Sequence, residues 1–158
     1  QRRISRCVGH KHDSRHLKIC RDIRKKIMPI IYDRRRPDMD GIIAIYQSSG
    51  IKRPVHDAER IREMYRHANL VVTAWDGDKP VGIARALTDF SYCCYLSDLA
   101  VRAEYQRQGI GKRLIAEVKQ AAGEQSMLLL LSAPAAMNYY PKIGMETVLN
   151  GFMIQRTK

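Results

Sequence analysis

The stretch of residues 95–113 constrains the fold most, because it combines a strand, a turn and the start of a helix. Residues 95–101 alternate between apolar and polar side chains, as a strand does. The following turn ends in Gln106-Arg107-Gln108-Gly109-Ile110-Gly111, where a helix is expected to begin. The two glycines leave the backbone open to close approach, and the first N–H groups of a helix carry partial positive charge. The stretch therefore predicts a binding site for phosphate or pyrophosphate.

Two common phosphate-binding motifs do not fit this turn. The dinucleotide-binding fingerprint requires a third glycine where Leu114 stands, and the P-loop requires Ser or Thr where Arg113 stands. The remaining pattern, Gln/Arg-x-x-Gly-x-Gly after a strand that ends in Leu-Ala-Val, resembles the acetyl-coenzyme A signature of the GCN5-related N-acetyltransferases, the GNAT family. The alternative is an ordinary strand-to-helix turn with two glycines. The agreement of strand, turn, helix and positive charge favours the first interpretation.

The order of the predicted elements also resembles the GNAT fold. This is an α/β fold in which a central mixed sheet with splayed parallel strands is flanked by about four helices. The resemblance covers residues 28–158, and residues 1–27 form a basic N-terminal extension, for which a non-native leader is an alternative. The patterns predict strands at 27–32, 70–75, 81–87, 95–101 and 127–131, helices at 40–47, 57–68, 109–122 and 135–143, and a final hairpin around Asn150-Gly151. Asp40 and Asp57 are the expected N-caps of the first two helices.

The resemblance implies that acetyl-coenzyme A is the cosubstrate and that an amine attacks its thioester directly. Its pantetheine arm would lie along the backbone of Leu99, Ala100 and Val101, with Asn138 as a further contact. A backbone N–H near Leu99 would stabilise the oxyanion. The pyrophosphate would be held by Gln106, Arg107, Gln108, Gly109, Ile110, Gly111, Lys112 and Arg113.

The resemblance also assigns a proton donor. Tyr140 stands four residues before Gly144, with Met145 next, as in the Tyr-x-x-x-Gly-Phe segment of many family members. Tyr140 is therefore expected to protonate the leaving sulfur, while Tyr139 has the wrong spacing by one residue. The alternative is that Tyr140 only packs.

The sequence does not identify a general base. Asp98, Glu63, His67 and His56 lie near the expected site, and each has an alternative role in capping, packing or surface charge. The acceptor pocket is expected between residues 47–56, the second helix and the turn at 88–94.

Positive charge is concentrated at the N-terminus. Residues 1–36 contain 13 of the 28 Lys and Arg, but only 3 of the 16 Asp and Glu. Such an arm either binds acidic partners or is solvated, and the second is preferred because nucleic-acid motifs are absent. The candidate ligands Cys7, His10, His12, His16 and Cys20 do not match zinc spacings, so no metal is expected.

The expected partner is a small-molecule amine. Acetylation of protein or RNA amines, or a non-catalytic acyl-coenzyme A binding or sensing module, are the alternatives. No membrane partner is expected, because no apolar run reaches the length of a bilayer span. A homodimer is left open. The spacing of Cys7, Cys20, Cys93 and Cys94 does not suggest a disulfide framework, which favours a reducing, cytoplasmic setting.

Overall fold

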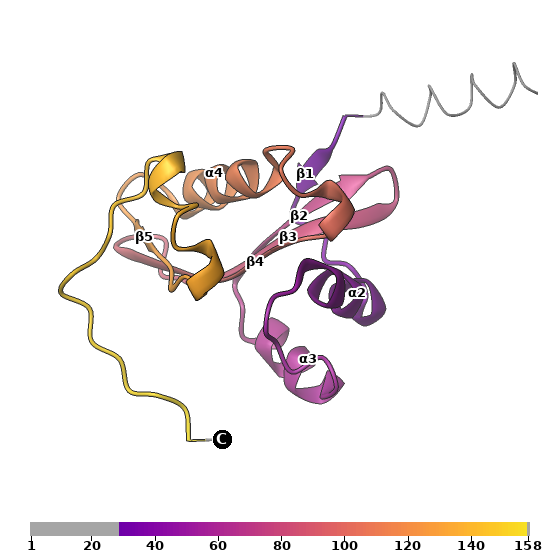
Figure 1. The fold of residues 1–158 in the computed structure, drawn as a ribbon, viewed down its shortest axis with the longest axis horizontal. Coiled ribbons are helices and arrows are strands. Elements are labelled where there is room, and N and C mark those ends of the chain that lie inside the picture. The colour runs from indigo at the N-terminus through magenta and orange to yellow at the C-terminus, as the bar shows by residue number, and fades with distance from the viewer. Residues whose placement is uncertain (1–28, 158) are drawn as a thin grey trace, which may run out of the picture.

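The computed structural model describes residues 29–157 and contains a five-stranded mixed sheet (Figure 1). The basic extension and the Cys and His residues within it lie outside the described residues. Of the strand predicted at 27–32, residues 29–32 are described, and the strand observed there begins at Ile31. The boundary at residue 28 therefore stays a prediction. The strands follow one another in sequence order: β1 (Ile31–Asp33), β2 (Leu70–Asp76), β3 (Lys79–Thr88), β4 (Cys93–Val101) and β5 (Met127–Leu129).

The first four strands are antiparallel, and β5 pairs with β4 in parallel. The hairpin of β2 and β3 and the parallel pair on either side of the signature helix are as predicted. A parallel pair needs a crossover connection, and here α4 (Ile110–Ala122) supplies it. The predicted mixed α/β sheet is thus confirmed.

The helices cover both faces of the sheet. α2 (Met39–Ser49) and α3 (Ala58–Arg66) lie on one face, and α4 lies on the other (Figure 1). Asp57 caps α3 as predicted, by accepting a bond from the Arg60 N–H. Asp38, and not Asp40, caps α2: its carboxylate accepts from the Gly41 N–H at 2.8 Å, which places Asp40 in the first turn. Acidic side chains thus satisfy the first turns of both helices.

β4 contains a bulge that the sequence pattern did not reveal. Two consecutive residues of β3, Arg85 and Ala86, lie opposite Asp98 and Leu96 of β4. Ser97 is therefore the extra residue, and a bulge of this kind bends its strand and increases the local twist.

The bulge changes which side chains of β4 face each layer of helices. Before it, Cys94 and Leu96 belong to the core under α4. After it, Leu99 and Val101 pack against that same core, whereas Ala100 belongs to the core under α2 and α3. Before the bulge the even-numbered side chains of β4 face α4, and after it the odd-numbered ones do.

The C-terminal quarter of the chain differs from prediction. The strand predicted at 127–131 is limited to Met127–Leu129, and it is not buried on both faces, since Met127 is 58% exposed. The helix predicted at 135–143 consists of two separate 3₁₀ turns, Pro134–Ala136 and Pro141–Ile143. Each turn begins at a proline, which lacks the N–H that a continuous helix requires at Pro141. The described residues thus contain three α-helices, one fewer than the predicted four.

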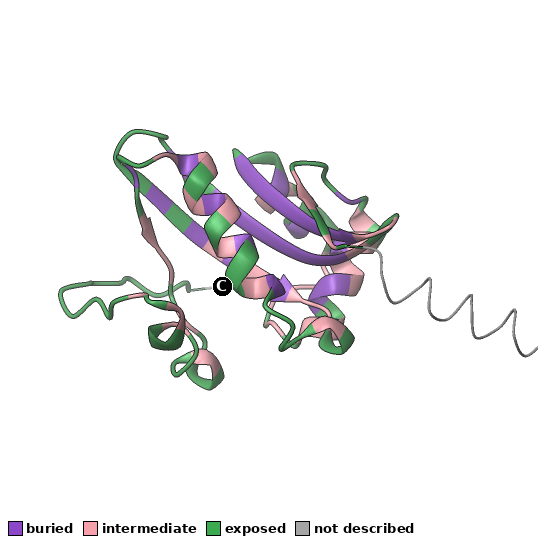
Figure 2. Ribbon diagram, turned by 90° about the horizontal axis from the view of Figure 1, so that it is seen from above, coloured by how far each residue is buried: buried purple, intermediate pink, exposed green. Residues whose placement is uncertain are grey.

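The predicted hairpin around Asn150-Gly151 is absent. Residues 145–157 form no strand and run along the outside of the molecule (Figures 1 and 2). Leu149, Phe152 and Ile154 are more than 90% exposed. A two-stranded hairpin is marginal in water unless its apolar face packs on something, and no packing partner is present among the described residues. Within residues 29–157, no helix has both the length and the apolar character needed to cross a bilayer.

Candidate active site

The two parallel strands separate beside the start of α4. β4 pairs with β5 only from Cys93 to Tyr95, where β5 ends at Leu129. Residues 99–101 pair with β3 alone, so their other edge has no strand partner in the described part of the chain. This edge is the predicted position of the pantetheine arm. An extended backbone edge of this kind can bond a ligand that runs along it.

The start of α4 has no side-chain cap. Gly109 is its N-cap and has a φ of 81°, in the left-handed region that favours glycine. The first turn contains no acidic residue, in contrast to α2 and α3, each of which an aspartate caps. The N–H groups of residues 109–112 are therefore free of side-chain acceptors, which suits an anion.

The basic side chains near this turn do not all face it. Arg107 and Lys112 are exposed, and Arg107 itself has a φ of 62°. Arg113 forms an ion pair with Glu117 at 2.6 Å, and its guanidinium lies 5.9 Å from the centre of the Tyr32 ring. Arg113 thus extends along α4 toward β1, so its predicted contact with the pyrophosphate is not supported.

Two glutamines of the turn stabilise the turn itself. The Gln106 side-chain amide donates to the carbonyls of Val101 at 2.9 Å and Ser49 at 3.3 Å. Gln108 donates to the Glu104 carbonyl at 3.1 Å. Because both side chains are hydrogen-bonded within the protein, only the backbone groups of these residues are available to a ligand.

Tyr139, and not Tyr140, lies against the start of α4. A Cβ on Gly111 would come within 3.1 Å of the Tyr139 hydroxyl and 4.0 Å of the Leu99 side chain. Gly111 therefore makes room for a tyrosine, which the spacing argument did not predict. Tyr140 packs edge-on against Tyr139, with the ring centres 5.2 Å apart. Its hydroxyl forms no hydrogen bond to any described residue, and Asn138 is exposed.

Both tyrosine hydroxyls keep their protons at neutral pH in this environment. Burial raises the pKa of Tyr139, and burial together with the adjacent Tyr139 raises that of Tyr140. Because an ordinary tyrosine already titrates near pH 10, both hydroxyls hold their protons at neutral pH. The electrostatics alone therefore do not distinguish between the two donors.

Asp98 is not available as a general base. Its side chain is fully buried, and its oxygens accept bonds from Arg53, Arg85 and Tyr46. It faces α2 and α3, inside the protein, with both carboxylate oxygens engaged. Sequence reasoning placed Asp98 near the site but missed its three partners.

The other candidate bases lie on the surface. Glu63 is paired with Arg66 and His67, and the Arg66 hydrogen bond holds the pKa of the Glu63 carboxyl below its usual value. His56 is exposed on the segment between α2 and α3. None of these side chains is brought to the open edge of β4, so the structure does not single out a base.

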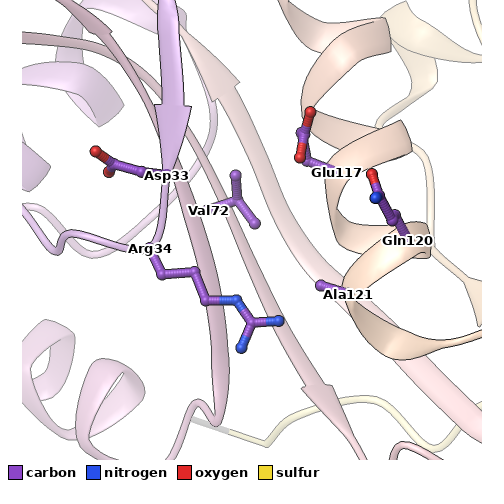
Figure 3. A pocket seen from close by; sticks show the side chains of 6 residues that line it. All are labelled: Asp33, Arg34, Val72, Glu117, Gln120 and Ala121. Atoms are coloured by element: carbon purple, nitrogen blue, oxygen red, sulfur yellow. The ribbon is translucent and has the colours of Figure 1, made fainter.

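A shallow pocket lies elsewhere, between β1 and the middle of α4 (Figure 3). Asp33 and Arg34 border it on one side, and Glu117, Gln120 and Ala121 border it on the other. It is on the side of α4 that faces β1, whereas the open edge of β4 is at the opposite end of the sheet, beyond the end of β5. We therefore place the candidate site at the start of α4 and not in this pocket.

Residues 36–145 match the sequence pattern of the acetyltransferase (GNAT) family. The uncharacterized N-acetyltransferase ycf52 of Gracilaria tenuistipitata var. liui is 33% identical over 73 residues, which cover 45% of this chain and 40% of that protein. The chain spans about half the length of the curated relatives it matches. Because the family pattern extends over more than half of the sequence, the chain belongs to the acetyltransferase (GNAT) family.

Solved structures share the fold. A probable acetyltransferase of methicillin-resistant Staphylococcus aureus superimposes with a TM-score of 0.69 at 20% identity, over 81% of this chain and all of that one. An aminoglycoside acetyltransferase from an uncultured soil metagenomic sample, solved in complex with sisomicin, gives a TM-score of 0.55 at 20% identity, over 80% and 97% of the two chains. At these identities the likeness establishes the fold alone.

Proposed function

We propose that this chain is an N-acetyltransferase that moves the acetyl group of acetyl-coenzyme A directly to an amine of a small molecule. The observation that carries the proposal is the uncapped, glycine-led start of α4 beside the unpaired edge of β4. Together they offer free N–H groups for a pyrophosphate and an extended backbone for the pantetheine arm. The cytoplasmic location stays a prediction.

The residues present fit this cosubstrate. Residues 109–112 would bind the pyrophosphate through backbone N–H groups, with Lys112 and Arg107 supplying charge. Residues 99–101 would bond the arm through main-chain groups, while the Leu99 and Val101 side chains pack under α4. Recognition of the arm therefore does not compete with core packing.

In the reaction, the neutral amine nitrogen forms a bond to the thioester carbonyl carbon, and the carbon–sulfur bond breaks. The backbone N–H near Leu99 stabilises the negative charge on the carbonyl oxygen as the amine attacks. The leaving sulfur takes a proton from a tyrosine hydroxyl, with Tyr140 as the expected donor and Tyr139 as the neighbour that could replace it. The amine loses its proton to water, and the tyrosinate takes a proton back from solvent, so that the protons balance.

The small-molecule acceptor rests on weaker support. The aminoglycoside acetyltransferase with the same fold binds sisomicin, a small polyamine, so the fold accommodates such acceptors. On the acceptor side of this chain, the surface of α3 has both signs of charge, with Arg62 paired to Glu59 and Arg66 paired to Glu63. This mixed surface shows no acidic or basic tract of the kind that selects a highly charged macromolecule.

The test is coenzyme A thiol release by the full chain against sisomicin, spermidine, an amino-acid amide, a lysine-containing peptide and a short RNA. Calorimetry with acetyl-coenzyme A measures cofactor binding separately. Turnover with one of the first three amines supports the proposal. Turnover with the peptide or the RNA alone would indicate a macromolecular acceptor. Binding of acetyl-coenzyme A without turnover of any amine would support a sensing module. Absence of acetyl-coenzyme A binding contradicts the whole proposal.

A further inference from the structure

A buried polar cluster lies between β4 and the two helices on its acceptor side. The Asp98 carboxylate has no exposed side-chain surface and accepts bonds from Arg53, Arg85 and the Tyr46 hydroxyl, the last at 2.9 Å. The hydroxyls of Tyr46 and Tyr65 are 2.8 Å apart. Buried charges are tolerated only when they are paired and hydrogen-bonded, and Asp98 meets both conditions.

The same two arginines hold the bulge of β4. Arg53 donates to the Ser97 carbonyl at 2.7 Å, and Arg85 donates to the Ser97 hydroxyl at 2.7 Å. Both the main chain and the side chain of the extra residue are therefore fixed. This is the point from which the strand continues into Leu99, whose N–H is expected to face the thioester carbonyl.

The two arginines differ in what they connect. Arg85 lies on β3 directly opposite Asp98, and its side chain is 8% exposed, so it belongs to the sheet. Arg53 lies on the segment between α2 and α3, and its side chain is 25% exposed. It is the residue through which this segment reaches both Ser97 and Asp98. A guanidinium suits this role because its planar fork holds two acceptors in a fixed relation, which an ammonium group does not.

We propose that Arg53 is a positioning residue for acetyl transfer, and this inference rests on the function proposed above. Its fork fixes the Ser97 peptide against the Asp98 carboxylate, and this sets the direction of the backbone that follows. Donors that stabilise an oxyanion act through being held in place before the reaction. Loss of the fork leaves the cofactor turn at residues 106–112 unchanged, but loosens the strand where charge develops.

Arg53→Lys tests the proposal, because it keeps the charge and removes the fork. Arg36→Lys is a matched control: Arg36 also bridges two acceptors, here the backbone carbonyls of Tyr65 at 2.9 Å and Ala68 at 2.7 Å. These carbonyls lie at the C-terminal end of α3, and Arg36 itself bonds neither Ser97 nor Asp98. Arg53→Gln is a second variant that retains one donor, in case the lysine perturbs folding. Melting temperatures of all variants establish that each full chain is folded.

The first readout is steady-state kinetics with the best amine of the panel. We expect Arg53→Lys to lower kcat by roughly 10²-fold, the loss that a small misplacement of reacting groups produces. The KM for acetyl-coenzyme A should stay close to that of the parent chain. Arg36→Lys should change the melting temperature and leave kcat nearly unchanged.

The second readout needs no acceptor. Acetyl-coenzyme A labelled with carbon-13 at the carbonyl is bound to each protein, and the carbonyl stretch is measured by infrared difference spectroscopy. A positioned N–H donor lowers this frequency, so the parent chain and Arg36→Lys should show the lowered band. Arg53→Lys and Arg53→Gln should show it moved back toward the free cosubstrate.

The outcomes separate this inference from the proposed function. If the parent chain does not bind acetyl-coenzyme A, both the proposed function and the role of Arg53 are overturned. If binding and turnover are intact but Arg53→Lys matches Arg36→Lys in both kcat and carbonyl frequency, only the role of Arg53 is overturned.

Discussion

The Tyr139 hydroxyl lies over Gly111, only 3.1 Å from where a Cβ at that position would stand. Glycine at this position is usually explained by the approach of a phosphate to the backbone. Here a second constraint acts from the protein side, because a side chain at this position would have to push the Tyr139 hydroxyl aside by a few tenths of an ångström. Tyr139 therefore cannot serve as an inert reference for its neighbour, and the two tyrosines must be tested as alternatives.

We expect Tyr140→Phe to lower kcat by roughly 10²–10⁴-fold if Tyr140 protonates the leaving sulfur. Acetyl-coenzyme A binding should survive, because only a hydroxyl is removed. The defect should shrink with acyl donors whose leaving thiol is more acidic. The measurement is a set of kcat values for the parent chain and for both single Tyr→Phe variants. A loss confined to Tyr139→Phe would assign the donor to the residue that contacts Gly111.

Gly109→Asp should abolish coenzyme A binding, because it puts a carboxylate where free N–H groups face an anion. Strain at a φ of 81° adds a stability cost of about 1–2 kcal/mol. Gly50→Asp is the control: Gly50 has a φ of 78° and, like Gly109, open space around its Cβ position. It lies at the end of α2, so Gly50→Asp should cost similar stability and leave binding intact. Calorimetry showing equal coenzyme A affinities for the two variants would argue against the assigned turn.

Gly111→Asp should also abolish coenzyme A binding, but for two reasons that can be separated. The carboxylate opposes the anion, and the added Cβ displaces Tyr139. Gly111→Ala in a Tyr139→Phe background removes the clash with the hydroxyl. If this double variant binds coenzyme A better than Gly111→Ala alone, the internal constraint is established by calorimetry.

Asp98→Asn should destabilise the fold by about 3–5 kcal/mol, because it leaves two guanidinium groups without their buried partner. Urea unfolding measures this change. Glu63→Gln is the comparison, since Glu63 pairs with Arg66 on the exposed surface of α3, where solvent screens the interaction. Equal unfolding free energies for the two variants would show that the cluster around Asp98 adds no stability.

Asp89 gives a pH-dependent contribution to stability. Its carboxylate accepts N–H bonds from Tyr92, Ser91 and Cys93, and these hold the pKa of Asp89 far below its ordinary value of about 3.9. Because the folded-state pKa is lowered, the stabilisation is complete above the unfolded-state pKa and is lost as the pH falls through the folded-state pKa.

Asp89→Asn keeps an oxygen acceptor and removes the titration. Its melting temperature should be lower than that of the parent chain at pH 7, and the gap should close as the pH falls below about 4. A gap that stays constant between pH 7 and pH 2 would show that the charge of Asp89 contributes nothing through this route.

The parts of the fold that sequence could predict are those with local signals. The Asp57 cap, the β2–β3 hairpin and the Gly109 helix start each follow from a few adjacent residues. The bulge at Ser97 has no such signal, because it depends on how β4 registers against β3. The two 3₁₀ turns did have one, since Pro134 and Pro141 both interrupt helical continuity.

The candidate site shows the same division. The predicted cofactor turn could be recognised from the sequence because the groups proposed to bind the pyrophosphate lie in one stretch of backbone. The cluster around Asp98 joins residues from β3, β4, α2, α3 and the segment between the two helices, so spacing along the chain does not reveal it. The available signal was that Arg85 and Asp98 occupy inward positions of predicted strands, where charged residues are rare unless they are paired.

The extra residue, Ser97, sets which side chains of β4 face each layer of helices. If Ser97 were paired in the ladder instead of bulged, regular alternation would turn the second half of the strand over. Leu99 would then face α2 and α3, and Asp98 would be pushed into the apolar layer beneath α4. Single-residue insertions and deletions elsewhere in this strand would shift one half against the other in the same way, so they should be far less tolerated than substitutions. The length of β4, as much as any side chain on it, sets how its unpaired edge lies relative to α2 and α3.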